Sequence, residues 1–283
     1  MIDVLKEATA FLNDKGVDQP RLNSERLLCH VLNIARVDLY LMFDRPLTFD
    51  ERNNFKQLLR RRINREPLQY LIGHTEFMSL NFRVTPDVLI PRPETEILVE
   101  KVIEDFKNKK NVRILDVGTG SGNIAISLTN YLNDAHVTTV DCSNKAITVA
   151  KENALLNKIT DKINFSQADI QEENFQKKID NGYDVVVSNP PYISLNEWSA
   201  IPDEIRLYEP RTALCDEGDG LIYFRIISSK CHNRIKPGGR IYFEVGDGQA
   251  YDVQKILLES GYHKIQTFPD LNDIERTVTG VRK

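Results

Sequence analysis

Residues 113–123 read Arg113-Ile114-Leu115-Asp116-Val117-Gly118-Thr119-Gly120-Ser121-Gly122-Asn123, and this stretch decides the fold. A hydrophobic run enters a glycine-rich turn, and apolar residues then recur at helical spacing, at Ile124, Ala125, Leu128 and Leu132. This order predicts a strand, a tight turn and a helix, the arrangement of a nucleotide-binding site. The glycines allow the backbone to approach a ligand closely.

The spacing of the glycines separates this turn from two other phosphate-binding loops. Dinucleotide-binding turns carry G-x-G-x-x-G, whereas this chain carries G-x-G-x-G, with Asn123 where the third glycine would stand. No Gly-Lys-Ser/Thr sequence follows, which excludes a P-loop. A second predicted strand, residues 136–140, ends at Asp141, whose carboxylate can accept both ribose hydroxyls of an adenosine.

A second motif, Asn189-Pro190-Pro191-Tyr192, directly follows the apolar run of residues 183–188. The run predicts a buried strand, and the prolines cannot continue it, so the chain turns out at the strand's carboxyl end, where open α/β sheets bind ligands. The asparagine oxygen and nearby carbonyls can accept both N–H bonds of a planar NH₂ group, while the tyrosine ring packs on its flat face. The alternative is a plain proline-rich turn, which the glycine-rich turn upstream disfavours.

The helical and strand patterns divide the chain into three parts. Residues 1–74 predict a small bundle of four amphipathic helices, in which Thr48 to Glu51 form a capping box and Pro67 ends the last helix. Residues 75–90 alternate loosely and predict a β-hairpin linker. Residues 91–283 alternate strands with helices, which predicts a parallel sheet covered on both faces. Its last runs, 263–268 and 275–281, are expected to be sheet-edge strands.

Composition narrows the classes of protein without identifying one. No apolar run reaches the ~18–20 residues of a membrane helix, and the first residues carry no secretory pattern. The four cysteines are scattered, which predicts neither a metal site nor disulfides and suits a reducing cytoplasm. A net charge of −4 favours a protein substrate over a nucleic acid, although a local basic patch would suffice for the latter.

The motifs resemble those of class I S-adenosylmethionine-dependent methyltransferases that act on an amide or amine nitrogen. Further segments resemble one family among these enzymes, the PrmC/HemK group of peptide chain release factor glutamine methyltransferases: Pro67–Gly73, Thr75–Phe77, Ile90–Glu96 and Tyr208–Leu214. The resemblance covers nearly the whole chain and is weakest over the first 65 residues.

This resemblance implies a Rossmann-like class I methyltransferase sheet with helices on both faces, preceded by an N-terminal helical bundle that recognises the release factor. It implies methylation of the glutamine in the Gly-Gly-Gln motif of class I release factors, with S-adenosylmethionine as methyl donor, S-adenosylhomocysteine as product and no metal. Substrate contacts are expected from Asn189, Pro190, Pro191 and Tyr192, with Asn189, Pro190 and Tyr192 as the catalytic residues. Cofactor contacts are expected from Asp116, Gly118, Thr119, Gly120, Ser121, Gly122, Asp141, Asp169, Ile170 and Asn189.

Several alternatives remain open at this point. An adenine exocyclic amine in DNA or RNA could be the acceptor, because the same tetrapeptide serves such enzymes, and a basic groove for a flipped base would then be needed. The chain could also be a non-catalytic interaction module. The basic cluster Arg60 to Arg65 is either a binding surface or a solvated helix end. We expect a cytoplasmic monomer without direct nucleic-acid contact.

Overall fold

A computed structural model describes residues 1–283 and divides the chain into two compact units. The helical unit comprises Met1–His74 together with Pro202–Tyr208. The sheet unit comprises Thr75–Ile201 and Glu209–Lys283. The segment Pro202–Tyr208 therefore packs with the N-terminal helices although it interrupts the second unit in the sequence. No helix of either unit is both long enough and apolar enough to cross a membrane.

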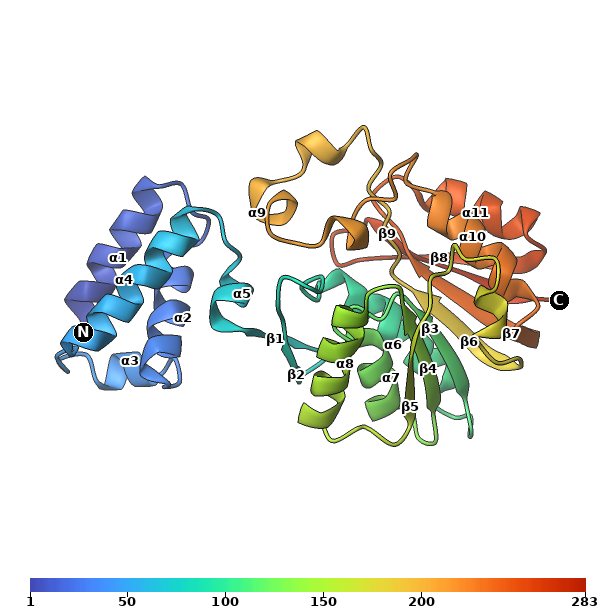
Figure 1. The fold of residues 1–283 in the computed structure, drawn as a ribbon, viewed down its shortest axis with the longest axis horizontal. Helices are drawn as coiled ribbons and strands as arrows, with labels where there is room; N and C mark the ends of the chain where they lie inside the picture. The colour runs from blue at the N-terminus through green and yellow to red at the C-terminus, as the bar shows by residue number, and fades with distance from the viewer. The chain divides into compact units, whose positions relative to one another are not determined.

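The helical unit is built around short amphipathic helices (Figure 1). They are α1 (Ile2–Asp14), α2 (Pro20–Leu32), α3 (Asp38–Leu41), α4 (Phe49–Ile63) and α5 (Leu68–Ile72), joined by α9 (Asp203–Arg206). Their apolar faces meet in one core that includes Leu12, Leu27, Leu28 and Phe55.

The prediction that Pro67 ends the last helix of the bundle was wrong. Helix α4 already ends at Ile63, and Pro67 stands before the first turn of α5, where its fixed φ suits the start of a helix.

The predicted capping box of α4 is confirmed. The Thr48 Oγ1 atom accepts a hydrogen bond from the Glu51 N–H at 3.2 Å, and the Glu51 carboxylate accepts one from the Thr48 N–H at 2.8 Å. Each bond satisfies a backbone donor that the helix itself cannot pair. The local sequence alone therefore fixes where this helix begins.

We expect Thr48→Ala to lower the free energy of unfolding by about 1 kcal/mol, because one backbone N–H of α4 loses its acceptor. Thr48→Ser is the matched control, since it keeps the hydroxyl. Urea unfolding of the full chain followed by circular dichroism would measure the difference. Equal stabilities for the alanine and serine variants would show that the cap does not stabilise the unit.

The basic cluster at the end of α4 is used mainly within the helical unit. Arg62 is buried, donates to the Asn23 side chain at 2.7 Å and pairs with Glu204 at 2.7 Å. Arg61 pairs with Glu66, and Arg65 donates to the Gly16 carbonyl at 2.7 Å. These arginines hold α4, α2 and the 202–208 segment together, which favours the structural interpretation of the cluster over a nucleic-acid surface.

The sheet unit contains a seven-stranded sheet in the order β5-β4-β3-β6-β7-β9-β8. Its strands are β3 (Arg113–Val117), β4 (His136–Asp141), β5 (Ile163–Gln167), β6 (Tyr183–Ser188), β7 (Ile235–Glu244), β8 (Tyr262–Pro269) and β9 (Glu275–Arg282). Strands β3 to β7 pair in parallel, and β9 pairs antiparallel with both β7 and β8.

The expectation that both last strands lie at the sheet edge was wrong for β9. The β8–β9 hairpin places its second strand beside β7, so only β8 is at the edge.

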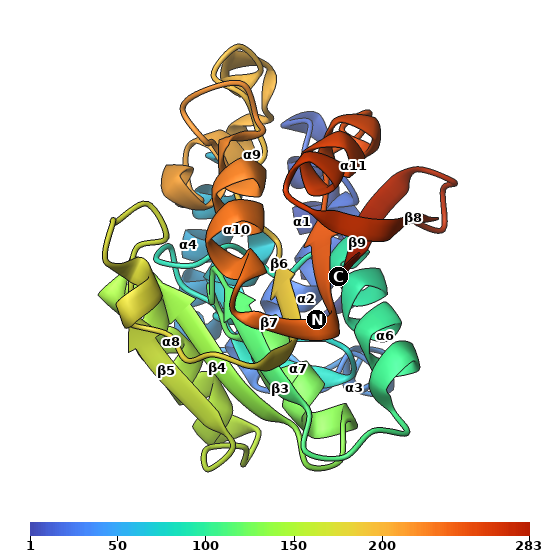
Figure 2. The same ribbon diagram turned by 90° about the vertical axis from the view of Figure 1, so that its right-hand side faces the viewer.

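Helices cover both faces of this sheet, as predicted. They are α6 (Glu94–Phe106), α7 (Asn123–Tyr131), α8 (Asn144–Leu156), α10 (Ile222–His232) and α11 (Ala250–Glu259). Alternate residues of β3 point to opposite faces: Ile114 packs in the core with α6 and α7, and Leu115 packs in the core with α10 and α11. Figure 2 shows α10 and α11 together on one side of the strands. Short 3₁₀ turns occur at Phe175–Lys177, Trp198–Ala200 and Arg211–Ala213.

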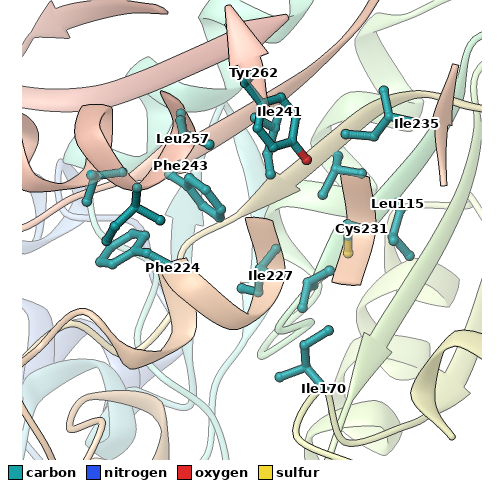
Figure 3. Packing of buried hydrophobic residues seen from close by; sticks show 14 of the residues in the cluster. Leu115, Ile170, Phe224, Ile227, Cys231, Ile235, Ile241, Phe243, Leu257 and Tyr262 are labelled. Atoms are coloured by element: carbon teal, nitrogen blue, oxygen red, sulfur yellow. The ribbon is translucent and has the colours of Figure 1, made fainter. Parts of the chain in front are cut away.

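The core between the sheet, α10 and α11 is closely packed (Figure 3). Phe224 of α10 meets Phe243 of β7 edge to face, with ring centroids 5.2 Å apart, and both side chains are fully buried. Aromatic pairs of this geometry add to the stabilisation from burial alone. This packing gives the carboxyl ends of β6 and β7 a rigid base.

A two-stranded sheet precedes α6, in the region where the sequence predicts a hairpin. It consists of β1 (His74–Phe77) and β2 (Leu80–Arg83). Met78 and Ser79 between the strands both have positive φ, at 48° and 56°, as a two-residue hairpin turn that matches strand twist requires. Phe77 and Phe82 pack edge to face beneath this turn.

Candidate functional site

A cavity of about 250 Å³ lies at the carboxyl ends of the parallel strands of the sheet unit. Because parallel strands end at the same edge, residues far apart in the sequence meet there. The cavity is lined by the glycine-rich turn after β3, by the ends of β4, β5 and β6, and by the start of α6. Lining residues that the sequence predicted are Gly118, Thr119, Gly120, Ser121, Asp141, Asp169, Ile170, Asn189, Pro190 and Pro191.

The glycine-rich turn takes a backbone shape that other residues resist. Gly118 and Gly122 have φ values of +90° and +82°. A Cβ atom on Gly122 would also lie 3.1 Å from the Ala150 Cβ, so this glycine allows the turn to pack against α8. At Gly120 a Cβ would meet nothing within 4 Å, which leaves space for a ligand above the turn.

Asp141 fastens the turn from the end of β4. One carboxylate oxygen accepts the Gly120 N–H at 2.9 Å, and the other accepts the Ser143 N–H at 2.8 Å. Burial raises the pKa of this carboxyl, and the two backbone donors oppose that rise. Each oxygen keeps a further lone pair, so Asp141 can hold the turn and still accept hydroxyl groups from a ligand.

Asp116 lies beneath the turn and is not among the residues that line the cavity. Its carboxylate accepts a hydrogen bond from the Thr139 hydroxyl at 2.7 Å, and that hydroxyl lies 2.6 Å from the Thr119 hydroxyl. The other carboxylate oxygen, Oδ1, has no partner. Burial raises the pKa of the carboxyl to about 7. The side chain is thus placed to support the turn from below.

Asn189 enters the cavity from the end of β6. Its Nδ2 donates to the Thr95 hydroxyl at 3.1 Å, and this hydroxyl lies 2.5 Å from a carboxylate oxygen of Glu244. Thr95 belongs to the first turn of α6, and Glu244 is the last residue of β7. Burial raises the pKa of the Glu244 carboxyl to about 7. The amide of Asn189 is therefore held from behind by a buried pair of side chains.

Tyr192 lies outside the cavity lining in this structure. Its ring is against Gly246, where an added Cβ would be 3.1 Å from the ring atom Cδ2. Its carbonyl accepts a hydrogen bond from the Gln249 side chain at 2.9 Å. Burial raises the pKa of its phenol. These contacts anchor the end of the Asn-Pro-Pro-Tyr segment on the sheet unit.

Arg92 also lines the cavity, beside the start of α6. It forms a salt bridge of 2.5 Å with the buried Glu209, whose other oxygen accepts the Ile90 N–H at 3.1 Å. Two segments that the resemblance singled out, around residues 90–96 and 208–214, are thereby joined. The pair fixes one wall of the cavity.

The sequence predicted no role for several residues that line the cavity or that bond to a residue lining it. These residues are Thr95 and Glu244, together with Pro210, Thr212 and Ala213, which also line the cavity. A carboxylate at the end of a hydrophobic strand is the sequence pattern that predicts a ligand contact at Asp141. The same signal is present at Glu244, which follows Tyr242 and Phe243. No cluster of three or more His, Cys, Asp or Glu side chains is arranged to hold a metal ion.

Comparisons with known proteins match both parts of the chain. A PrmC N-terminal domain matches residues 3–73, and a methyltransferase domain matches residues 108–268. The release factor glutamine methyltransferase of Chlorobaculum tepidum is 38% identical over 281 residues, covering 98% of this chain and 95% of that protein. The enzyme of the same name from Geobacter sulfurreducens is 39% identical over 277 residues, with the same coverage.

One solved structure has a fold similar to that of this chain. Ribosomal protein L11 methylase from Lactobacillus delbrueckii subsp. bulgaricus superposes with a TM-score of 0.51 at 21% identity, covering 71% of this chain and 85% of that one. At this level of identity the likeness concerns the fold alone, and it agrees with the predicted methyltransferase sheet.

Proposed function

Because the chain belongs to the release factor glutamine methyltransferase family, we propose that it methylates the side-chain amide nitrogen of a release-factor glutamine. The observation that carries this proposal is the match over 98% of the chain with relatives of that name. The position of Asn189 supports it, because an amide oxygen at the end of β6 can accept a hydrogen bond from an NH₂ group.

We infer that the cavity holds S-adenosylmethionine, the methyl donor that the methyltransferase family implies. When bound, the cofactor supplies an electrophilic methyl group on a sulfonium sulfur. We assign its methionine part to the open space over Gly120 and the left-handed turn around it. The spare acceptor positions of Asp141 suit the ribose hydroxyls, and Asp169 with Ile170 line the region proposed for the adenine.

The chain contributes positioning more than acid–base chemistry. An amide nitrogen is a weak nucleophile, so holding it in line with the methyl group is the main way to make it react. We assign this task to the Asn189 side-chain oxygen and the backbone carbonyl at Pro190, with Pro191 and Tyr192 shaping the acceptor end. Transfer would form one N–CH₃ bond on the glutamine amide as the S–CH₃ bond of the cofactor breaks, and the displaced amide proton would pass to water.

The finer identity of the substrate is also part of the proposal. We infer that the acceptor is the glutamine of the Gly-Gly-Gln motif in class I release factors. We propose that residues 1–74 recognise the release factor, that residues 75–90 link the two domains, and that residues 91–283 carry out methyl transfer. We expect the enzyme to act as a monomer in the cytoplasm, where translation termination takes place, and without direct contact to nucleic acid.

A methyl-transfer assay tests this proposal. Purified protein is incubated with methyl-labelled S-adenosylmethionine and a class I release factor, or with the same factor whose Gly-Gly-Gln glutamine is changed to alanine. Label is expected on the first and not on the second. Label on both would move the site to another residue, and label on neither would reject the release factor as substrate.

The second candidate function, methylation of an adenine amine in DNA or RNA, is not favoured by the names of the relatives. Adding DNA or RNA to the same assay tests it directly. A non-catalytic role would be revived only if the protein failed to bind S-adenosylmethionine in calorimetry.

A further inference from the structure

Three polar side chains from distant parts of the sequence form a continuous chain that begins with Asn189 and Thr95 at the cavity wall and ends at Glu244 behind it. Asn189 follows β6, Thr95 lies in the first turn of α6, and Glu244 ends β7. Thr95 is 1% exposed and Glu244 is 2% exposed. The Asn189 Nδ2 lies 3.1 Å from the Thr95 Oγ1, which lies 2.5 Å from the Glu244 Oε2.

Counting protons fixes the direction of both hydrogen bonds. A threonine hydroxyl has one proton to donate, and an ionised carboxylate can only accept. When Glu244 is ionised, the single proton of Thr95 is therefore committed to it. Thr95 can then only accept from Asn189, so the Asn189 NH₂ group must face Thr95. The amide oxygen Oδ1 is left on the opposite side.

We propose that Thr95 and Glu244 are positioning residues that fix the amide orientation of Asn189, so that Oδ1 faces the glutamine NH₂ group. This inference rests on the proposed function. The opposite orientation would turn the Asn189 NH₂ toward the substrate NH₂, placing donor against donor and removing the acceptor. Rotation of the amide about its last bond exchanges the two orientations, so an external group must choose between them.

The charge state of Glu244 determines whether the Asn189 amide is restricted to one orientation. A protonated Glu244 can itself donate to Thr95, which frees the Thr95 proton for the oxygen of a flipped Asn189. The groups that act on Glu244 are Arg92, Glu94, Arg276 and the Tyr192 phenol. The pKa of Glu244 is raised from 4.5 to about 7: burial is the main cause, Glu94 adds to the rise, and the Thr95 hydrogen bond and the two arginines oppose it.

The sign of the pH dependence follows from these states. Below the pKa of Glu244 its protonated form permits both orientations of Asn189, and above it the ionised form permits only the productive one. We therefore expect kcat to rise with pH through about 7. Cofactor affinity is expected to show no matching change, because Glu244 does not line the cavity and the Asn189 side-chain oxygen that it orients is assigned to the acceptor amide.

The first test compares substitutions of Thr95 in the release-factor methylation assay. Thr95→Val removes the hydroxyl at nearly constant volume and is expected to lower kcat about ten- to a hundredfold, with the Kd for S-adenosylmethionine within about twofold. Thr95→Ser restores the hydroxyl and is expected to recover most of kcat. Thr129→Val is the matched control, because Thr129 is also buried and its hydroxyl donates to the Ala125 carbonyl within α7.

Glu244→Gln provides a second test that does not depend on Thr95. Glutamine can donate to Thr95 or accept from it, so the orientation is no longer enforced. We expect a lower kcat that is constant between about pH 6 and 8, with a melting temperature measured at each pH to exclude unfolding. Asp116, whose pKa burial also raises to about 7, remains in this variant and reports any other titration.

The outcomes separate this inference from the function on which it rests. Wild-type kcat in Thr95→Val, a loss in Thr95→Ser equal to that in Thr95→Val, or a rising pH limb that persists in Glu244→Gln would each overturn the positioning role while methylation by the wild type stands. Absence of methylation by the wild-type protein would reject the proposed function, and this inference with it.

Discussion

Asn189→Ala is expected to lower kcat for release-factor methylation by about a thousandfold, while the Kd for S-adenosylmethionine stays within a few-fold. The substitution removes the oxygen proposed to hold the acceptor amide. It also leaves Thr95, which is fully buried, with a vacant acceptor position and no partner besides Glu244. Both effects concern the Asn189 side chain, whereas the backbone at residue 189, the glycine-rich turn and Asp141 remain available to the cofactor.

The expected fall in kcat is large because the enzyme has few other means of making the amide nitrogen react. The amide nitrogen has a delocalised lone pair, and no general base is evident beside Asn189, so geometry supplies most of the rate. Single-turnover methylation of the release factor measures the chemical step, and calorimetry measures cofactor affinity. Asn164→Ala, at an exposed position of β5, is the matched control. Transfer that survives in Asn189→Ala would mean that another group holds the glutamine.

Local sequence signals predicted the elements of the sheet unit well. The strand 113–117, its glycine-rich turn and Asp141 are each encoded within a few residues, and the structure places them around one cavity. The capping box at Thr48 is equally local and is confirmed. Such features are readable because neighbouring residues alone determine backbone shape.

Features that depend on distant partners were not readable. Strand β9 lies inside the sheet because it pairs with β7 and β8 together, and no pattern within residues 275–282 reports that. Thr95 and Glu244 are separated by 149 positions, so their hydrogen bond has no local signature. Asp116 has the sequence position of a cofactor ligand, yet its side chain does not line the cavity and accepts a hydrogen bond from the Thr139 hydroxyl. Tertiary placement decided each of these cases.

Asp141→Ala is expected to weaken S-adenosylmethionine binding by about 1–3 kcal/mol, which is roughly a five- to 150-fold rise in Kd. Two losses contribute. The ribose hydroxyls lose the proposed acceptor, and the backbone N–H groups of Gly120 and Ser143 lose the carboxylate that fastens the turn. Calorimetry measures the change, and Asp134→Ala, at an exposed turn before β4, is the matched control.

Combining Asp141→Ala with a modified cofactor in a thermodynamic cycle separates the loss of the ribose contact from the loss of support for the turn. Replacing S-adenosylmethionine by its 2′-deoxy analogue removes one ribose hydroxyl and leaves the turn intact, so wild-type protein should bind the analogue more weakly. If Asp141 contacts the ribose, the alanine variant should bind both cofactors almost equally, because the contact is already gone. If the variant discriminates between them as the wild type does, the ribose contact belongs to another residue, and the contribution of Asp141 to affinity comes only from holding Gly120 and Ser143 in place.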